Sequence, residues 1–357
     1  MTSVSDRLFV ATRKGLFTVV RKSRRWTIDR LEFAGMPVSA VLEDPRDGWR
    51  YVALAHGHFG AKLHRAAPGE PFEEIAAPAF PESDEKGPAL GSIWCLEPGP
   101  APGNLLAGVM PAALFRSDKR GEDWQLNRGL FDRPERSAWF GGGTDEPALH
   151  TVLLHEKTPR RIIVAISCGG VWASDDDGAN WNASTGMIAE YMPPERANDP
   201  NVQDPHRIAQ CQADPSRLWA QHHHGPYRSD DGGRSWQRLV DPAPSGFGFP
   251  VVAHPSEADT AWFVPEQADT ERMPVDGRVS VTRTRDGGRS FEVLSRGLPA
   301  ENAYDLVYRH GLAVDGSGTR LAIGSTTGGL WVSEDEGDSW KMVPARLPPV
   351  YAVRFAP

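Results

Sequence analysis

Cysteine is scarce in this sequence, and so are long apolar runs and excess positive charge. The 357 residues include three cysteines, Cys95, Cys168 and Cys211, and their spacing fits neither a disulfide framework nor a short metal motif. No apolar run approaches the ~20 residues that span a bilayer, and the opening MTSVSDRLFV lacks the layout of a signal peptide. The net charge of -8 argues against nucleic acid and anionic membranes as partners. We therefore expect a cytoplasmic protein with reduced thiols.

Glycine, proline and tryptophan are abundant by contrast, and the tryptophans follow a repeated pattern. The pattern is Ser/Thr-x-Asp-x-Gly-x-x-Trp/Phe, and it occurs as SDDDGANW (174–181), SDDGGRSW (229–236), TRDGGRSF (284–291), SEDEGDSW (333–340) and the near copy SDKRGEDW (117–124). Two weaker relatives end at Phe72 and Trp26. The seven aromatic anchors are separated by 46 to 57 residues, which indicates a repeat architecture.

Each copy has the composition of a tight turn that ends in a core residue. Short Ser and Asp side chains bond to nearby backbone N–H groups, Gly adopts positive φ at little cost, and the aromatic ring fills the interior. A calcium loop needs more oxygen ligands than these copies offer. We therefore assign a structural role to the following residues: Asp176, Trp181, Asp231, Trp236, Asp286, Phe291, Asp335 and Trp340.

These runs resemble Asp-box (BNR) repeats, which are typical of sialidase-like β-propellers. Stretches such as TRKGLF, PAALFRS and FGFPVVAHP also resemble bacterial soluble proteins described as exo-alpha-sialidase-like or glycosyl-hydrolase-like. The resemblance covers nearly the whole chain and implies the propeller fold. It does not imply one activity, because Asp-boxes occur in sialidases, other glycosidases, sorting receptors and assembly factors alike.

The repeat period predicts an all-β fold, with residues 1–357 forming a single seven-bladed β-propeller of four-stranded antiparallel blades. Apolar runs bounded by Pro, Gly and Asp indicate the strands, for example 150–156, 160–167 and 170–174. We expect the first blade to be shared between residues 7–32 and 349–356, so that the C-terminal strand closes the ring. On this plan the Asp-box turns lie on the bottom face, and a ligand site lies on the top face.

Histidines and charged residues gather on the segments that this plan assigns to the top face, which include a long excursion at 266–278. His150 and His206 open the innermost strands of adjacent blades, and His223 follows the strand beside the one that His206 opens. We predict that the catalytic residues are His150, His206, His223 and Glu266, and that the substrate-binding residues are His58, Glu146, Tyr191 and Arg272. The long top linkers carry further carboxylates: Glu82, Asp84, Glu85, Asp145, Glu190 and Asp204.

A divalent transition metal is the one cofactor that the sequence suggests. His150, His206 and His223 are its predicted ligands, since imidazoles converging from separate blades suit such an ion. The alternative is rim histidines that form hydrogen bonds and bind no metal. The lack of a short ligand motif favours that alternative.

Two classes of function stay open. The first is an enzyme, a hydrolase or lyase, that acts on a small polar substrate such as a sugar or glycoside through the histidine and carboxylate rim. The second is a non-catalytic binding or assembly propeller with a protein partner. The uneven long loops favour a pocket and hence the enzyme. True sialidase activity is disfavoured, because RLFVATRKGLF stands where sialidases carry an Arg-Ile-Pro stretch.

Overall fold

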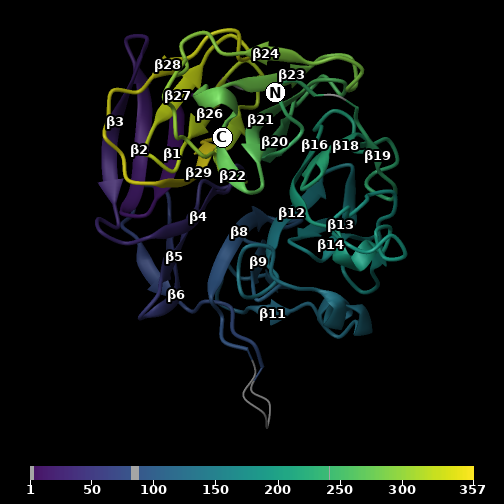
Figure 1. Cartoon of the computed structure of the whole chain (residues 1–357). Helices are drawn as coiled ribbons and strands as arrows, with labels where there is room; N and C mark the ends of the chain where they lie inside the picture. The colour runs from purple at the N-terminus through teal and green to yellow at the C-terminus, as the bar shows by residue number, and fades with distance from the viewer. Residues whose placement is uncertain (1–3, 82–87, 241) are drawn as a thin grey trace. The chain divides into compact units, whose positions relative to one another are not determined.

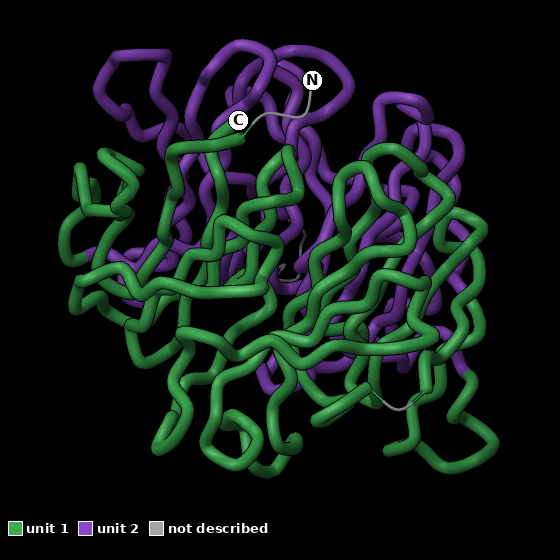
Figure 2. The backbone as a smooth tube through the Cα atoms, turned by 90° about the horizontal axis from the view of Figure 1, so that it is seen from above, with its two compact units in different colours: residues 1–35, 185–198, 205–357 green, residues 36–184, 199–204 purple. Residues whose placement is uncertain are grey.

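The computed structural model describes residues 4–81, 88–240 and 242–357, and nearly all of its regular structure is β-strand (Figure 1). The strands form seven antiparallel sheets, each built on a path of four strands. The predicted fold class, an all-β seven-bladed propeller with four-stranded blades, is therefore confirmed. By their internal contacts the residues divide into two compact units, unit 1 and unit 2, which are coloured separately in Figure 2.

Unit 1 comprises residues 1–35, 185–198 and 205–357 and holds four of the sheets. Their strands, in sheet order, are β29 (Val350–Phe355), β1 (Arg7–Thr12), β2 (Gly15–Lys22) and β3 (Arg25–Glu32); β16 (Pro205–Gln210), β17 (Leu218–His222), β18 (Gly225–Ser229) and β19 (Gln237–Arg238); β20 (Gly248–Ala253), β21 (Ala261–Ala268), β23 (Val281–Thr284) and β24 (Glu292–Leu294); β25 (Leu312–Val314), β26 (Leu321–Gly324), β27 (Leu330–Ser333) and β28 (Lys341–Met342).

Unit 2 comprises residues 36–184 and 199–204 and holds the other three sheets. Their strands are β4 (Val38–Glu43), β5 (Arg50–His56), β6 (Gly60–Ala66) and β7 (Glu73–Ile75); β8 (Ser92–Pro98), β9 (Leu105–Met110), β10 (Ala113–Ser117) and β11 (Gln125–Leu126); β12 (Leu149–His155), β13 (Thr158–Ile166), β14 (Gly170–Ser174) and β15 (Asn182–Ala183). The linkers carry α1 (Arg128–Phe131) and the 3₁₀ turns η1 (Pro134–Ala138) and η2 (Pro200–Val202). Within the described ranges, no helix has the length and apolar character needed to cross a membrane.

The first sheet of unit 1 joins the two ends of the described chain. Strand β29 pairs antiparallel with β1, from Leu8 opposite Phe355 to Thr12 opposite Val350. Val350, Phe355 and Leu8 pack in one buried apolar cluster, so the strand is held by side chains as well as by its ladder. The predicted pairing of the C-terminal strand with the N-terminal strands is confirmed, and the expectation of a single domain stays a prediction.

The repeated Ser-x-Asp-x-Gly turns connect the third and fourth strands of their sheets. In the 174–181 turn, the Ser174 hydroxyl accepts a hydrogen bond from Gly178 N at 2.8 Å, and the Asp176 carboxylate accepts one from Asn180 N at 2.8 Å. Equivalent bonds are made by three other pairs: Ser229 and Asp231, Thr284 and Asp286, Ser333 and Asp335. Hydrogen bonds led by the Asn180 side chain lower the pKa of Asp176 to about 2. The aspartates therefore hold the turns, as their residue types predict.

The turn at 117–124 reaches the same result with a different residue. Lys119 occupies the position of the aspartate, and Asp123 replaces that side chain. Its carboxylate accepts hydrogen bonds from Asp118 N and Lys119 N at 3.0 Å and from the Ser117 hydroxyl at 2.7 Å. A carboxylate therefore still holds this turn, although the aspartate of the repeat pattern is absent.

The segment 266–278, which was expected to be a long excursion, contains regular secondary structure. It contains a fifth strand of its sheet, β22 (Glu271–Pro274), and the 3₁₀ turn η3 (Val275–Gly277). Strand β22 pairs back onto β21, with Glu266 opposite Pro274. Backbone pairing therefore fixes the position of Glu266, one of the predicted catalytic residues.

Replacing Asp286 by alanine should lower the free energy of unfolding by about 1–2 kcal/mol, because its carboxylate accepts hydrogen bonds from two backbone N–H groups, Arg289 N and Ser290 N. Urea titration of the purified variant checks this loss. Arg289→Ala, on the exposed side of the same turn, is the control and should stay within ~0.5 kcal/mol of wild type. Equal losses in the two variants would contradict the turn role of the carboxylate.

Candidate functional site

His206 stands on a β-bulge at the start of β16. Pro205 pairs with His222 and Arg207 pairs with Gln221, so His206 is the extra residue of the ladder. Bulges of this kind re-aim a side chain. The ring is 2% exposed, and its Nδ1 lies 2.6 Å from the Gly248 carbonyl oxygen. Because a carbonyl only accepts, Nδ1 carries the proton, and Nε2 is the basic nitrogen of the neutral ring.

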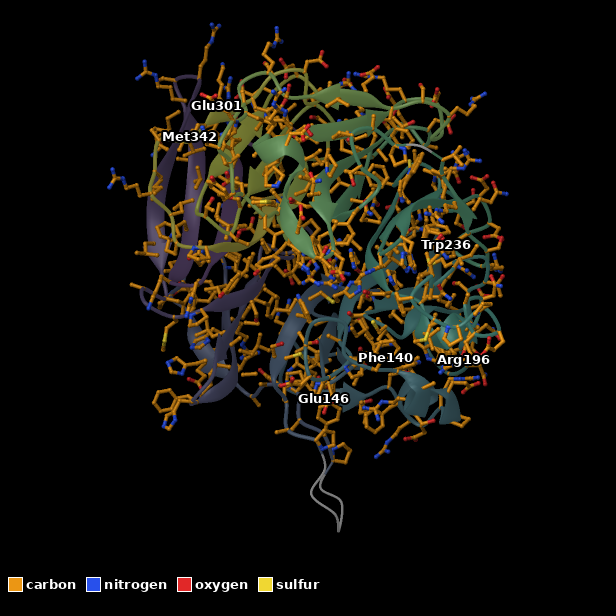
Figure 3. The ribbon with its side chains drawn as sticks, viewed as in Figure 1. Phe140, Glu146, Arg196, Trp236, Glu301 and Met342 are labelled. Carbon is orange, nitrogen blue, oxygen red and sulfur yellow. The ribbon has the colours of Figure 1, made fainter. Side chains whose placement is uncertain are left out.

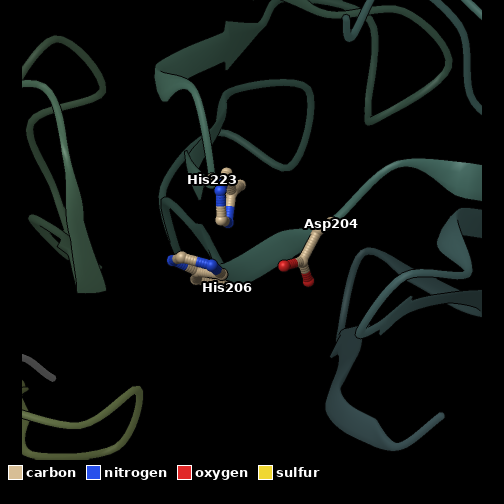
Figure 4. A group of neighbouring side chains, drawn as sticks. All are labelled: Asp204, His206 and His223. Atoms are coloured by element: carbon tan, nitrogen blue, oxygen red, sulfur yellow. The ribbon is translucent and has the colours of Figure 1, made fainter. Parts of the chain in front are cut away.

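Three consecutive histidines form the turn between β17 and β18. The buried His222 accepts a hydrogen bond from His224 N at its Nδ1, 3.1 Å away, which tightens the turn. This geometry brings the His223 ring to 5.4 Å from the His206 ring (Figure 4). The Nε2 atom of His223 lies 3.8 Å from a carboxylate oxygen of Asp269. Two imidazoles therefore face each other in unit 1, one bonded to the Gly248 carbonyl and the other facing the Asp269 carboxylate.

Aromatic side chains surround the two imidazoles. His206 stacks on Phe249 with ring centroids 4.6 Å apart and planes 15° apart, and Phe247 lies 5.7 Å from both His206 and His223. Tyr191 covers the outer side of His223 at 5.4 Å and is itself 40% exposed. The cluster thus has an apolar floor and one face toward solvent, which suits a ligand with apolar and polar parts.

Guanidinium groups lie on the same aromatic floor. The guanidinium carbons of Arg272 and Arg309 are 5.6 and 5.5 Å from the centroid of Phe249, within cation–π range. Arg272 also forms an ion pair with Asp269, the carboxylate beside His223, at 2.5 Å. Groups of both charges therefore lie beside the aromatic floor, and this arrangement favours strongly polar ligand groups.

Glu266 lies directly behind this floor and is fully buried. Its backbone N–H donates to the Phe247 carbonyl at 2.8 Å. The Oε1 atom accepts from Val307 N at 3.2 Å, whereas Oε2 has no hydrogen-bond partner among the described residues. Burial raises the pKa of this carboxyl to about 8, and the negative charge of Asp305 adds to the rise while the Val307 bond opposes it. The group is therefore neutral near pH 7 and can donate a proton.

The neighbouring carboxylate, Asp305, has a different environment. Its Oδ1 accepts from the Ser325 hydroxyl at 2.7 Å and from the Thr327 hydroxyl. Two carboxyl groups of unit 1 thus lie in contrasting surroundings, one with an unsatisfied oxygen and one held by hydroxyl donors. Such contrast is a common feature of acid–base sites.

The structure brings some of the predicted site residues together within unit 1 and places others in unit 2. His206, His223, Tyr191 and Arg272 share the cluster described above. In unit 2, His150 is fully buried beside Thr151, and His58 is exposed on the β5–β6 turn. Glu146, also in unit 2, is exposed before β12 (Figure 3). The participation of these three residues stays a prediction. Glu82, Asp84 and Glu85 lie outside the described residues.

Sequence reasoning missed Phe247, Phe249 and Asp305. The two phenylalanines flank Gly248 at the start of β20, a position equivalent to that of His206 on β16. Comparing the starts of the innermost strands in the sequence could therefore have predicted that these phenylalanines lie near His206. Asp305 lies in the linker between β24 and β25, where no strand sets the phase.

These contacts define a histidine-rich cluster with acid–base character on a β-propeller. No family model matches the sequence, and no curated protein matches it either. Solved structures match the fold at low sequence identity.

Among them is the GH74 xyloglucanase from Xanthomonas campestris, with a TM-score of 0.64 and 18% identity over 96% of this chain. The match spans 53% of that enzyme, so this chain corresponds to about half of its length. YCF48 from Cyanidioschyzon merolae matches with a TM-score of 0.53 and 12% identity, over 87% of this chain and 86% of its own. YCF48 bound to D1 peptide gives 0.51 and 14% over 86% and 82%. At such identities the likeness shows the seven-bladed propeller fold alone.

Proposed function

We propose that this protein is an enzyme, a hydrolase or lyase, that acts on a small carbohydrate-like substrate at the unit 1 cluster. The observation that carries the proposal is the Glu266 carboxyl, fully buried with Oε2 lacking a partner. An oxygen that is buried without a hydrogen bond costs stability, and the carboxyl offsets this cost only with the bond that Oε1 accepts from Val307 N. A surface that only docks a partner gives no reason to keep it, whereas proton transfer does.

Glu266 would serve as the acid and His223 as the base. The protonated carboxyl gives its proton to the leaving-group oxygen of the substrate, and the imidazole, oriented by Asp269, takes a proton from water or from the substrate carbon. A hydrolase takes the proton from water and a lyase takes it from carbon, so one pair serves both reactions. Glu266 is buried, and the linker 295–311 donates the Val307 N–H to it, so in this proposal the linker moves to admit the substrate.

Exposed tyrosines support a carbohydrate-like substrate. Tyr191, Tyr304 and Tyr308 are 40%, 65% and 39% exposed, and each presents an apolar ring with a polar tip. Sugars are likewise amphipathic, with apolar ring faces and polar edges. The same propeller fold is used by a xyloglucanase. The hydrogen-bonded aspartate turns further support our proposal that these are Asp-box repeats of the sialidase-like superfamily.

A peptide-binding propeller without catalysis is the second candidate. The exposed Tyr304 and Tyr308 favour it, since aromatic residues on long linkers are also common in protein interfaces. YCF48, which shares the fold, has been solved with a bound peptide. This candidate requires no role for Glu266, and that difference separates the two.

The test is a screen of aryl glycosides, oligosaccharides and uronides with wild type and Glu266→Gln. Glutamine keeps the shape of the protonated carboxyl but cannot release a proton. We expect turnover of one substrate class, reduced about 100-fold or more in the variant. Glu271→Gln, exposed on the adjacent β22, is the matched control and should keep wild-type turnover. No turnover by wild type would favour the peptide-binding candidate, whereas equal turnover in Glu266→Gln would contradict the acid role of Glu266.

A further inference from the structure

We infer that His206 and His223 are the core ligands of a site for a divalent transition-metal ion. A bound ion would occupy the His223 nitrogen that acts as the base in the proposal above, so His223 fills only one of the two roles at a time. A ring nitrogen of each histidine lies within 4.8 Å of a ring nitrogen of the other. Imidazole nitrogens bind such ions at ~2.0–2.1 Å, so two nitrogens on one ion stand about 3–4 Å apart. A small rotation of the partly exposed His223 ring is enough to reach that spacing.

One nitrogen of each ring faces an oxygen acceptor, as in many metal-bound histidines. His206 donates from Nδ1 to the Gly248 carbonyl at 2.6 Å, so Nε2 would be its ligand atom. The Gly248 carbonyl thereby fixes the tautomer of His206. His223 has its Nε2 3.8 Å from the Asp269 carboxylate, which is longer than a hydrogen bond but favours Nδ1 as its ligand atom.

Two imidazole ligands leave positions on the ion open for water, which is a feature of catalytic zinc sites.

The aromatic floor sets the conditions around the ion. Phe247 and Phe249 exclude water from one side of both imidazoles, which strengthens each metal–ligand bond by lowering the local dielectric. His206 is almost fully buried, while His223 borders the exposed Tyr191, so the ion would enter from the Tyr191 side. Imidazole ligands suit Zn²⁺, Co²⁺, Ni²⁺ or Cu²⁺ better than Mg²⁺ or Ca²⁺.

Titration calorimetry with Zn²⁺, and the visible absorption of added Co²⁺, test the site on the untagged full chain after dialysis against a chelator. We expect one equivalent to bind and an absorption spectrum typical of four- or five-coordinate Co²⁺. His206→Ala and His223→Ala should each weaken Zn²⁺ binding at least 100-fold, and the outer partner variant Asp269→Asn should weaken it about 10- to 100-fold.

His224→Ala is the matched control, because this histidine lies in the same turn and its Nδ1 faces Glu190, 3.7 Å away. It should keep the wild-type affinity. If His206→Ala fails to fold, judged by circular dichroism, the pair His223→Gln and Asp269→Asn decides the question. Absence of Zn²⁺ and Co²⁺ binding at 1 mM metal (roughly the weak limit of a specific site), or unchanged affinity in both His223 and His206 variants, overturns the inference. Because binding is measured without substrate, this outcome is independent of the glycoside screen.

Discussion

Glu266→Gln should stabilise the folded protein at pH 9 by up to about 5 kcal/mol relative to wild type. In the folded protein, burial raises the pKa of Glu266 from its ordinary 4.5 to about 8. Below pH 4.5 the carboxyl is protonated in both the folded and the unfolded chain, so it contributes no difference. Between pH 4.5 and about 8 only the unfolded chain releases the proton, and each pH unit costs the folded state about 1.4 kcal/mol. Glutamine does not titrate, so the variant escapes this loss.

Urea denaturation of wild type and variant at pH 5 and pH 9 checks this prediction. The two proteins should differ little at pH 5 and diverge as the pH rises to 8, with no further divergence above it. Glu271→Gln, on the exposed side of the hairpin, should follow wild type at both pH values. A difference between Glu266→Gln and wild type that is the same at pH 5 and pH 9 would show that the carboxyl is not held in its neutral form.

The same substitution is expected to remove activity, and the two outcomes together are informative. A residue that lowers stability and is needed for turnover fits the trade-off common at active sites. If Glu266→Gln gains stability and the protein has no turnover to lose, the buried carboxyl must be explained by a role other than proton transfer. The stability measurement therefore retains its value whichever function is correct.

Trp181→Ala should lower the free energy of unfolding by about 3–5 kcal/mol. The side chain is 2% exposed and packs in a cluster with Leu130 and Trp172. Its Nε1 donates to Asn127 Oδ1 and to the Gly178 carbonyl, each at 3.0 Å. Truncation leaves a cavity and removes both of these hydrogen bonds, although Asn127 Oδ1 still accepts from Leu130 N.

Thermal and urea unfolding measure the effect, and the chain offers a matched control at the equivalent position of another turn. Trp124 is only partly buried, and its Nε1 donates to a single acceptor, the Ala76 carbonyl at 3.2 Å. Trp124→Ala should therefore cost clearly less. If the two variants lose the same stability, burial of the ring is not what makes the anchor important.

Local chemistry explains which parts of the fold could be predicted. The turn at 174–181 is held by hydrogen bonds between residues at most four positions apart, so its sequence alone contains the information. The pairing of β22 with β21 was not predicted, because the residues of β22 lack the apolar alternation that indicates a strand. Lys119 shows the limit of motif matching. Asp123 supplies the carboxylate that holds this turn, but its position is variable in the repeat pattern.

The candidate site was harder to predict because its contacts join residues far apart in the sequence. Strand phase brings His206 and His223 into one region, since they lie at the same ends of paired strands. It does not reveal the bulge that turns His206 toward the Gly248 carbonyl. The burial of Glu266 was also beyond reach, because it depends on the linker 295–311 packing over the end of β21.

The sheet formed by β29, β1, β2 and β3 has a consequence for how the protein is made. During synthesis β1 emerges before the strands of the other six sheets, and its partner β29 emerges after them. Until then one edge of β1 has no strand beside it, and exposed edges invite pairing with other chains. The nascent chain must therefore be shielded, by its own later strands or by a chaperone, until β29 has emerged. Stalling translation before β29 is made should raise aggregation more than stalling it after β29 is made.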